Sequence, residues 1–104
     1  MSETMKFLQL IAHYLNFEDI LCMKLRTDIA SMLLNERHER GLTQAQLADL
    51  IESTQAELSK WENGDSNLTM KTLVRICAKL DLIPSISFEK RDMSLAISGG
   101  GSDG

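Results

Sequence analysis

The side chains best suited to chemistry cluster between residues 55 and 60, where an amide, a carboxylate, a hydroxyl and a cation follow closely. Gln55 can present its carbonyl and amide together to an adenine edge, and Lys60 can reach guanine or phosphate. Ala56 can lie against a thymine methyl, and Glu57 can accept from cytosine or repel wrong sequences. Ser59 lies one helical turn on from Gln55. These five residues are predicted to contact base edges.

A second set of polar side chains stands near predicted helix ends, where backbone amides and the helix dipole favour a phosphate. Gln44 begins one helix, and Lys71 lies near the start of another. We expect phosphate contacts from Thr43, Gln44, Asn63 and Lys71. Lys71, Arg75 and Lys79 recur at four-residue spacing, which is also typical of a solvated helix face.

Two short helices must position these residues. Thr43 is a good cap for a helix over 44–51, and Ser53 or Thr54 caps a helix over 55–63 that Gly64 ends. The inward-facing positions are Leu47, Leu50, Ile51, Leu58 and Trp61. Two short helices with almost no linker have the geometry of a helix-turn-helix, whose second helix lies in the major groove.

Longer elements flank this pair. Apolar residues at three- and four-residue spacing predict an amphipathic helix over 3–15. Asn16 can cap a second helix that runs to about residue 40, where Gly41 supplies a left-handed stop. Thr69 opens a helix to about residue 80, and beyond Pro84 residues 85–89 alternate as a strand would. SGGGSDG, residues 98–104, is predicted to be a flexible tail.

The central motif is specific enough to indicate a family. GLTQAQLADLIESTQAELSKWENG, residues 41–64, resembles the helix-turn-helix of the XRE family, the Cro and lambda-repressor-like DNA-binding domains. The similarity covers roughly residues 28–80. The matching positions are Gly41, Leu42, Thr43, Gln44, Leu47, Ala48, Leu58, Ser59, Glu62 and Gly64.

The resemblance carries three expectations about individual residues. It implies that Gln44 braces Gln55, and that Arg37 and Glu62 form a partly buried ion pair between the preceding helix and the end of the recognition helix. Glu52 stands where the family usually has a glycine. Since glycine tolerates positive φ cheaply, we expect strain or a different turn there.

Residues 69–90 are similar to HipB-like and HigA-like antitoxins, in which a C-terminal strand pairs between two subunits. The alternative is that these C-terminal residues form an irregular tail. An isolated strand has unpaired backbone groups and needs a partner, and a twofold-related copy is the simplest source. The sequence thus predicts a homodimer joined through Ile86 and Phe88, which reads a palindromic operator.

The expected fold class is all-α: a five-helix, lambda-repressor-like domain with an extra N-terminal helix and a short C-terminal β-strand paired in a dimer. We expect an N-terminal amphipathic extension over 1–23 and a helix-turn-helix domain over 24–82. A dimerisation segment over 83–97 and the tail over 98–104 follow.

The charge of the chain is acidic, at a formal −4, but its distribution is uneven. Residues 1–23 carry one base and three acids, residues 81–104 carry two bases and four acids, and residues 24–80 carry eight of each. The central segment is therefore neutral, which favours recognition through helix ends and placed side chains over a broad positive field. The acidic flanks are candidate surfaces for a basic partner.

Several classes of site find no support in the sequence. His13 and His38 have no second ligand at metal spacing, and Cys22 and Cys77 lie on apolar stripes as small buried hydrophobes. No activated nucleophile, secretory signal or membrane-spanning run is visible. We expect no enzyme activity, cofactor, metal or membrane association, and a cytoplasmic location.

The leading hypothesis is a sequence-specific transcriptional repressor that binds double-stranded DNA. The C-terminal resemblance, together with an N-terminal apolar face that could dock a toxin, favours the antitoxin of a type II toxin–antitoxin module that autoregulates its operon. A stand-alone phage-type or metabolic XRE repressor without a toxin is one alternative. A protein-interaction module that has lost DNA binding is the other.

Overall fold

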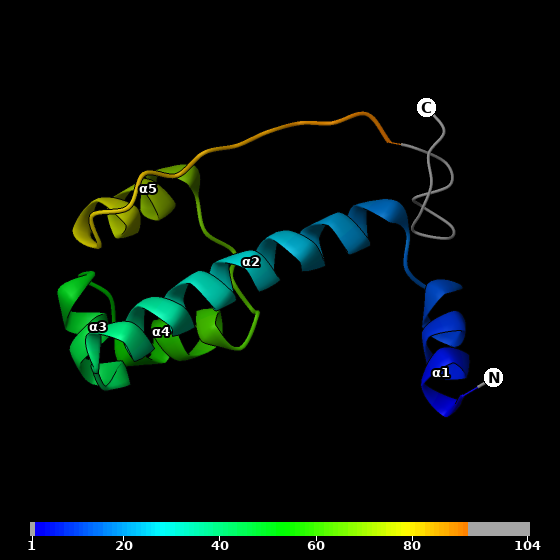
Figure 1. Cartoon of the computed structure of the whole chain (residues 1–104), viewed down its shortest axis with the longest axis horizontal. Helices are drawn as coiled ribbons and strands as arrows, with labels where there is room; N and C mark the ends of the chain where they lie inside the picture. Colours follow the sequence, from blue (N-terminus) through cyan, green and yellow to red (C-terminus); the bar gives the residue numbers. More distant parts are fainter. Residues whose placement is uncertain (1, 92–104) are drawn as a thin grey trace.

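The computed structural model describes residues 2–91 of the chain and is helical, as the sequence predicts. Figure 1 shows a long helix that leads from the N-terminal part of the chain into a group of shorter helices. The elements are α1 (Glu3–Ala12), α2 (Phe17–Arg40), α3 (Gln44–Leu50), α4 (Gln55–Glu62) and α5 (Met70–Lys79). These five include the N-terminal helix, so the helix-turn-helix domain itself uses four.

Each helix begins at a side-chain cap. At the start of α2, Asn16 accepts from the Asp19 amide at 2.8 Å, and the Asp19 carboxylate accepts from the Asn16 amide at 3.2 Å. Thr43 begins α3 with the same reciprocal pattern. Thr54, and not Ser53, does so for α4. Because caps satisfy the first backbone amides locally, the helix starts are encoded in the sequence.

Four helices end in a left-handed residue. α2 and α4 end at Gly41 (φ 65°) and Gly64 (φ 83°), as expected. α3 and α5 end instead at Glu52 and Asp81, each at φ 60°. At Glu52 the amides of residues 52 and 53 donate back to Asp49 and Ala48, at 3.2 and 2.8 Å. This Schellman pattern usually takes glycine, so a glutamate there is strained.

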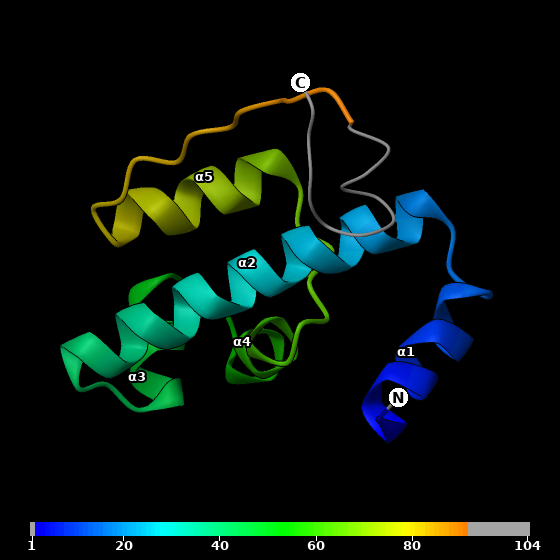
Figure 2. The same cartoon turned by 45° about the vertical axis from the view of Figure 1, so that its right-hand side comes forward.

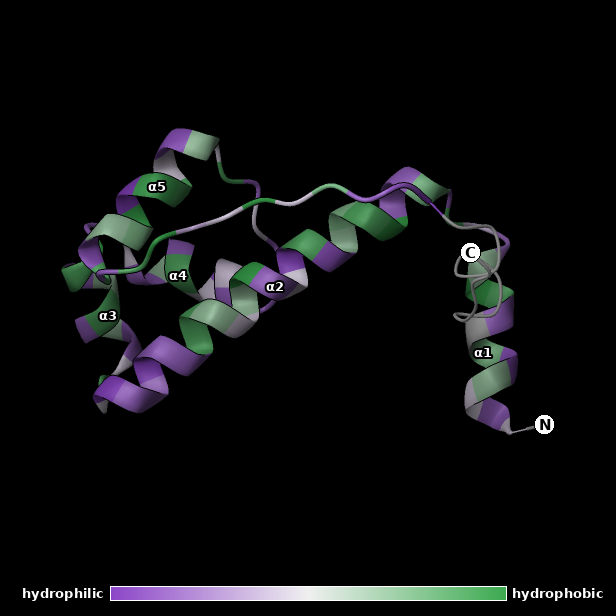
Figure 3. Ribbon diagram, turned by 45° about the horizontal axis from the view of Figure 1, so that its top comes forward, coloured by the Kyte–Doolittle hydropathy of each residue, from purple (hydrophilic) through white to green (hydrophobic). Residues whose placement is uncertain are grey.

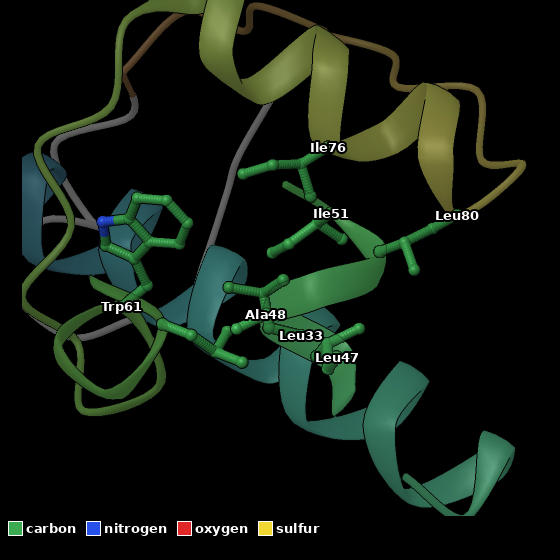
Figure 4. Close-up of a cluster of buried hydrophobic side chains, with 8 residues drawn as sticks. Leu33, Leu47, Ala48, Ile51, Trp61, Ile76 and Leu80 are labelled. Carbon is green, nitrogen blue, oxygen red and sulfur yellow. The ribbon is translucent and has the colours of Figure 1, made fainter. Parts of the chain in front are cut away.

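The core lies where α2, α3, α4 and α5 meet (Figure 4). Its buried side chains are Leu33, Leu47, Ala48, Ile51, Leu58, Trp61, Ile76 and Leu80. α4 packs against both α2 and α3. Ala48 is 2% exposed, and its small side chain permits the close approach of neighbouring helices. Trp61 belongs to this core, which confirms its predicted structural role.

α1 and the first half of α2 project away from the core (Figures 1 and 2). Apolar residues on this projecting part face solvent, and Figure 3 shows hydrophobic ribbon along it. Among the described residues, no helix combines the length and apolar character needed to cross a membrane. Residues 2–91 also hold no cluster of three potential metal ligands.

The C-terminal segment after α5 is irregular up to residue 91. The strand expected over 85–89 is not formed, because no strand among residues 2–91 offers backbone partners there. Ile86 is 67% exposed and Phe88 is 93% exposed. The expected tail at 98–104 lies outside the described residues.

The two cysteines differ, which corrects one expectation. Cys22 is exposed, because it lies on the projecting half of α2, beyond the core that its apolar stripe joins further along. Cys77 is buried, as predicted, and burial raises the pKa of its thiol. The thiolate is the reactive form, so Cys77 is shielded both sterically and electrostatically.

This difference predicts the reactivity of Cys77. In a Cys22→Ser variant, the remaining thiol should react with a disulfide reagent more than ~100-fold more slowly in the folded protein than in urea. The rate is followed by absorbance as urea is raised. A fast reaction without urea would show that α5 does not shield Cys77.

Candidate nucleic-acid interface

The candidate interface is built on α4, which begins at Gln55. The side chains of Gln55, Ala56 and Lys60 are exposed, and Ser59 is half-buried. Four-residue spacing places Gln55 with Ser59, and Ala56 with Lys60, on neighbouring lines of one helix face. The opposite face carries Leu58 and Trp61 into the core. The core therefore fixes which side of α4 faces outward.

A continuous polar network ties this face to α2 and α3. The Glu62 carboxylate accepts two hydrogen bonds from the Arg37 guanidinium, at 2.8 and 3.1 Å. The same carboxylate accepts from Gln44 Nε2 at 2.9 Å. The Gln44 carbonyl oxygen in turn lies 3.4 Å from Gln55 Nε2, which donates to it. The ion pair and the glutamine bracing that the resemblance implies are both present, joined through Gln44.

The network also sets the polarity of Gln55. Because Glu62 can only accept, Gln44 must turn its amide towards the carboxylate and its carbonyl towards Gln55. Gln55 then uses one amide hydrogen in its hydrogen bond to Gln44. Its carbonyl oxygen and its second amide hydrogen are left for other partners. In a glutamine side chain, these are the two groups that can pair with N6 and N7 of an adenine.

The ion pair at the inner end of the network is well shielded. The Glu62 side chain is 5% exposed and that of Arg37 is 29% exposed. The hydrogen bond to Glu62 raises the pKa of Arg37 above its ordinary value. Two charge-assisted bonds in a fixed fork geometry hold the end of α4 against α2.

Three of the predicted contact residues also have roles within the chain. Glu57 accepts from the Thr54 amide at 3.0 Å, as part of the cap of α4. Thr43 accepts from the Gln46 amide at 3.1 Å, and Asn63 donates to the Ser59 carbonyl at 2.9 Å. Lys71 is exposed on the first turn of α5.

The turn between α3 and α4 is held by residues that sequence reasoning assigned to a solvated face. Arg75 of α5 donates to the carbonyls of Ile51 and Glu52, at 3.2 and 2.7 Å. Lys79 forms an ion pair with the Glu52 carboxylate at 2.9 Å, which lowers the pKa of Glu52. Arg75 and Lys79 therefore brace the strained turn. The sequence shows the four-residue spacing of Arg75 and Lys79, but it does not show their partners, which lie more than 20 positions away.

The comparisons with known proteins agree with this geometry. The model of the helix-turn-helix family HTH_3 matches residues 33–85, which is about half of the chain. The core, the two short helices and the polar network all lie within this range. The protein belongs to the helix-turn-helix family. No curated protein matches the chain significantly.

Solved structures resemble the same part of the chain. An HTH_3 family transcriptional regulator from Vibrio cholerae is 32% identical, with a TM-score of 0.55 over 60% of this chain. The match spans 35% of that regulator, about a third of its length. HipB bound to the O4 20mer is 32% identical, with a TM-score of 0.51, and the match covers 62% of this chain and 92% of HipB. The HipA–HipB–O2–O3 complex contains a chain 32% identical, with a TM-score of 0.50 and the same coverage.

The network predicts the consequence of losing Arg37. The Arg37→Ala substitution leaves the shielded Glu62 carboxylate without its cation, so the free energy of unfolding should fall clearly. The Lys24→Ala control breaks the exposed pair with Asp28 and should change stability by no more than about 0.5 kcal/mol. Urea unfolding of both variants makes the comparison. If the Arg37→Ala and Lys24→Ala variants were equally stable, the Arg37–Glu62 pair would contribute no more to the free energy of unfolding than the exposed pair does.

The left-handed turn predicts an unusual effect of glycine. Glu52→Gly should raise the unfolding midpoint, because glycine adopts positive φ without strain and its absent Cβ costs no packing at an exposed turn. Glu39→Gly, in the last turns of α2, is the matched control and should lower the midpoint. Thermal unfolding measures both. A destabilised Glu52→Gly variant would mean that the contact with Lys79 outweighs the backbone strain.

Proposed function

We propose that this protein is a sequence-specific transcriptional repressor that binds operator DNA through α4. The observation that carries the proposal is the network from Arg37 through Glu62 and Gln44 to Gln55. It fixes a bidentate side chain at the exposed start of a helix that the core holds rigidly. Preorganisation of this kind lowers the entropy cost of base readout. HipB, which the domain resembles, is solved bound to a 20mer.

The proposed contacts divide between bases and phosphates. Base-edge readout is assigned to Gln55, Ala56, Glu57, Ser59 and Lys60. Phosphate contacts are assigned to Thr43, Gln44, Asn63 and Lys71, which lie at or near helix ends. Because the amides that begin α3 lie beside Thr43 and Gln44, these two residues can fix the register on the backbone, while α4 selects the sequence.

The proposed active form is a homodimer on a palindromic operator. The irregular segment with Ile86 and Phe88 exposed is the proposed source of an intersubunit strand, since it has no strand partner in the part of the chain that the structure describes. Residues 83–97 then form the dimerisation segment after a DNA-binding domain at 24–82. Residues 1–23 precede that domain as an extension and 98–104 follow as a tail, although α2 runs unbroken across position 23.

We propose further that the repressor is the antitoxin of a type II toxin–antitoxin module and controls its own operon. Support comes from the HipA–HipB–O2–O3 complex, in which a similar chain is assembled with HipA. A stand-alone repressor remains the second candidate, since the matched region is the DNA-binding domain. The neighbouring gene distinguishes these two functions, because only an antitoxin requires an adjacent toxin gene. An antitoxin should also co-purify with the product of that gene.

The DNA-binding proposal predicts the effect of altering α4. A Gln55→Ala and Lys60→Ala double variant should bind the protein's own promoter ~10- to 100-fold more weakly, because a bidentate base contact contributes about 1–3 kcal/mol. The matched control is Lys6→Ala with Gln9→Ala, which removes the same two residue types from α1. Fluorescence anisotropy at one fixed salt concentration gives both affinities.

Two outcomes would contradict the assignment. Equal affinities of the double variant and the control would remove Gln55 and Lys60 from the interface. No measurable promoter binding by the unaltered protein, at any site within its own regulatory region, would favour a protein-interaction module instead.

A further inference from the structure

The N-terminal arm, defined as residues 2–25, exposes apolar side chains in two helical stripes. On α1, Phe7 and Leu10 are 60% and 56% exposed, and Tyr14, in the turn that follows α1, is 79% exposed. On α2 the second stripe consists of Phe17, Leu21 and Leu25, which are 39–62% exposed. Regular spacing of the exposed apolar residues indicates an amphipathic helix face, since randomly placed exposed residues would show no periodicity.

The total apolar area exposed on the arm is comparable to that of a protein interface. The large hydrophobic residues exposed on the arm are Met5, Phe7, Leu10, Tyr14, Phe17, Ile20, Leu21, Met23 and Leu25. At about half exposure of ~150–200 Å² each, they offer on the order of 800 Å². One side of a standard protein interface buries ~800 Å².

The arm folds locally but does not pack against the core. Ser2 caps α1, and the Asn16–Asp19 capping box begins α2. α1 has 10 residues and lies apart from the other helices (Figures 1 and 2). Helices shorter than ~12 residues are marginal in water without packing. The arm therefore needs an occupant for its apolar face.

The chemistry of the arm favours a second copy of the same chain. Its charged residues are nearly balanced, with two lysines and three acids, so it neither attracts phosphate nor strongly repels itself. An interface about a twofold axis uses the same surface of both copies, so a stripe with little net charge can pack against its own copy. α2 is one 24-residue helix that carries the arm at one end and Arg37 at the other. A twofold axis at the arm would set the separation of the two α4 helices.

We propose that the N-terminal arm is a homodimer interface, in which the stripes on α1 and the first half of α2 pack against the same stripes of a second copy. This inference rests on the proposed function, because a dimer is what a palindromic operator requires. It differs from the C-terminal strand because it uses helix packing, although the two regions meet where the Arg91 guanidinium lies 3.8 Å from the centre of the Phe17 ring. The proposed occupant is a second copy of the chain, and coverage by a toxin is an outcome of the test.

The test compares two variants of the full chain with equal added charge. Leu10→Glu with Leu21→Glu places carboxylates in the stripes, and Gln9→Glu with Thr27→Glu places them on other exposed positions of the same helices. Sedimentation equilibrium gives the dimer dissociation constant. The stripe variant should weaken dimerisation at least ~100-fold, and the control should leave it unchanged. Circular dichroism with urea unfolding checks that both variants keep the core.

Three results would overturn the proposal. In the first, the stripe variant dimerises as tightly as the unaltered protein. In the second, only the Ile86→Glu with Phe88→Glu variant separates the dimer. In the third, the protein is a monomer and only the product of the neighbouring gene covers its arm. Promoter binding, measured in parallel, tests the proposed function separately. If the stripe variant loses the dimer but the unaltered protein does not bind the promoter, the proposed interface stands and the proposed repressor function is rejected.

Discussion

The carboxylate of Glu62 is the point on which the interface depends. It is the only negatively charged group in the network, and it receives Arg37 from α2 and Gln44 from α3 while itself ending α4. Three helices are therefore joined at one buried acceptor. Since a shielded carboxylate strongly requires its donors, the orientation of each donor is fixed, and that order passes outward to Gln55.

A second constraint acts at the other end of α4. The turn that leads into this helix contains a glutamate in the left-handed region, where glycine is the usual residue. Arg75 and Lys79 of α5 hold the carbonyls and the carboxylate at this turn. The recognition helix is thus anchored at its end by the Glu62 network and at its start by α5. Partial burial strengthens the Arg37–Glu62 pair, whereas the Lys79–Glu52 pair is exposed.

Much of the fold was predictable because its signals are local. The caps at Asn16, Thr43 and Thr69 and the stops at Gly41 and Gly64 act within a few residues, so helix boundaries follow closely from the sequence. The N-terminal helix proved shorter than expected, ending at residue 12, because helix ends without a glycine or proline carry a weak signal. The expected strand depends on a partner strand, and the described residues supply none.

The sequence by itself determined the helices, the family motif and the identity of the side chains on α4, because periodicity and capping are properties of neighbouring residues. Tertiary structure alone decided that Gln44 links the ion pair to Gln55, that Arg75 secures the α3–α4 turn, and that Cys22 is exposed. These depend on contacts between residues far apart in the chain, or on where the core ends along α2. Spacing within one helix carries no information about which distant side chain or backbone carbonyl lies opposite.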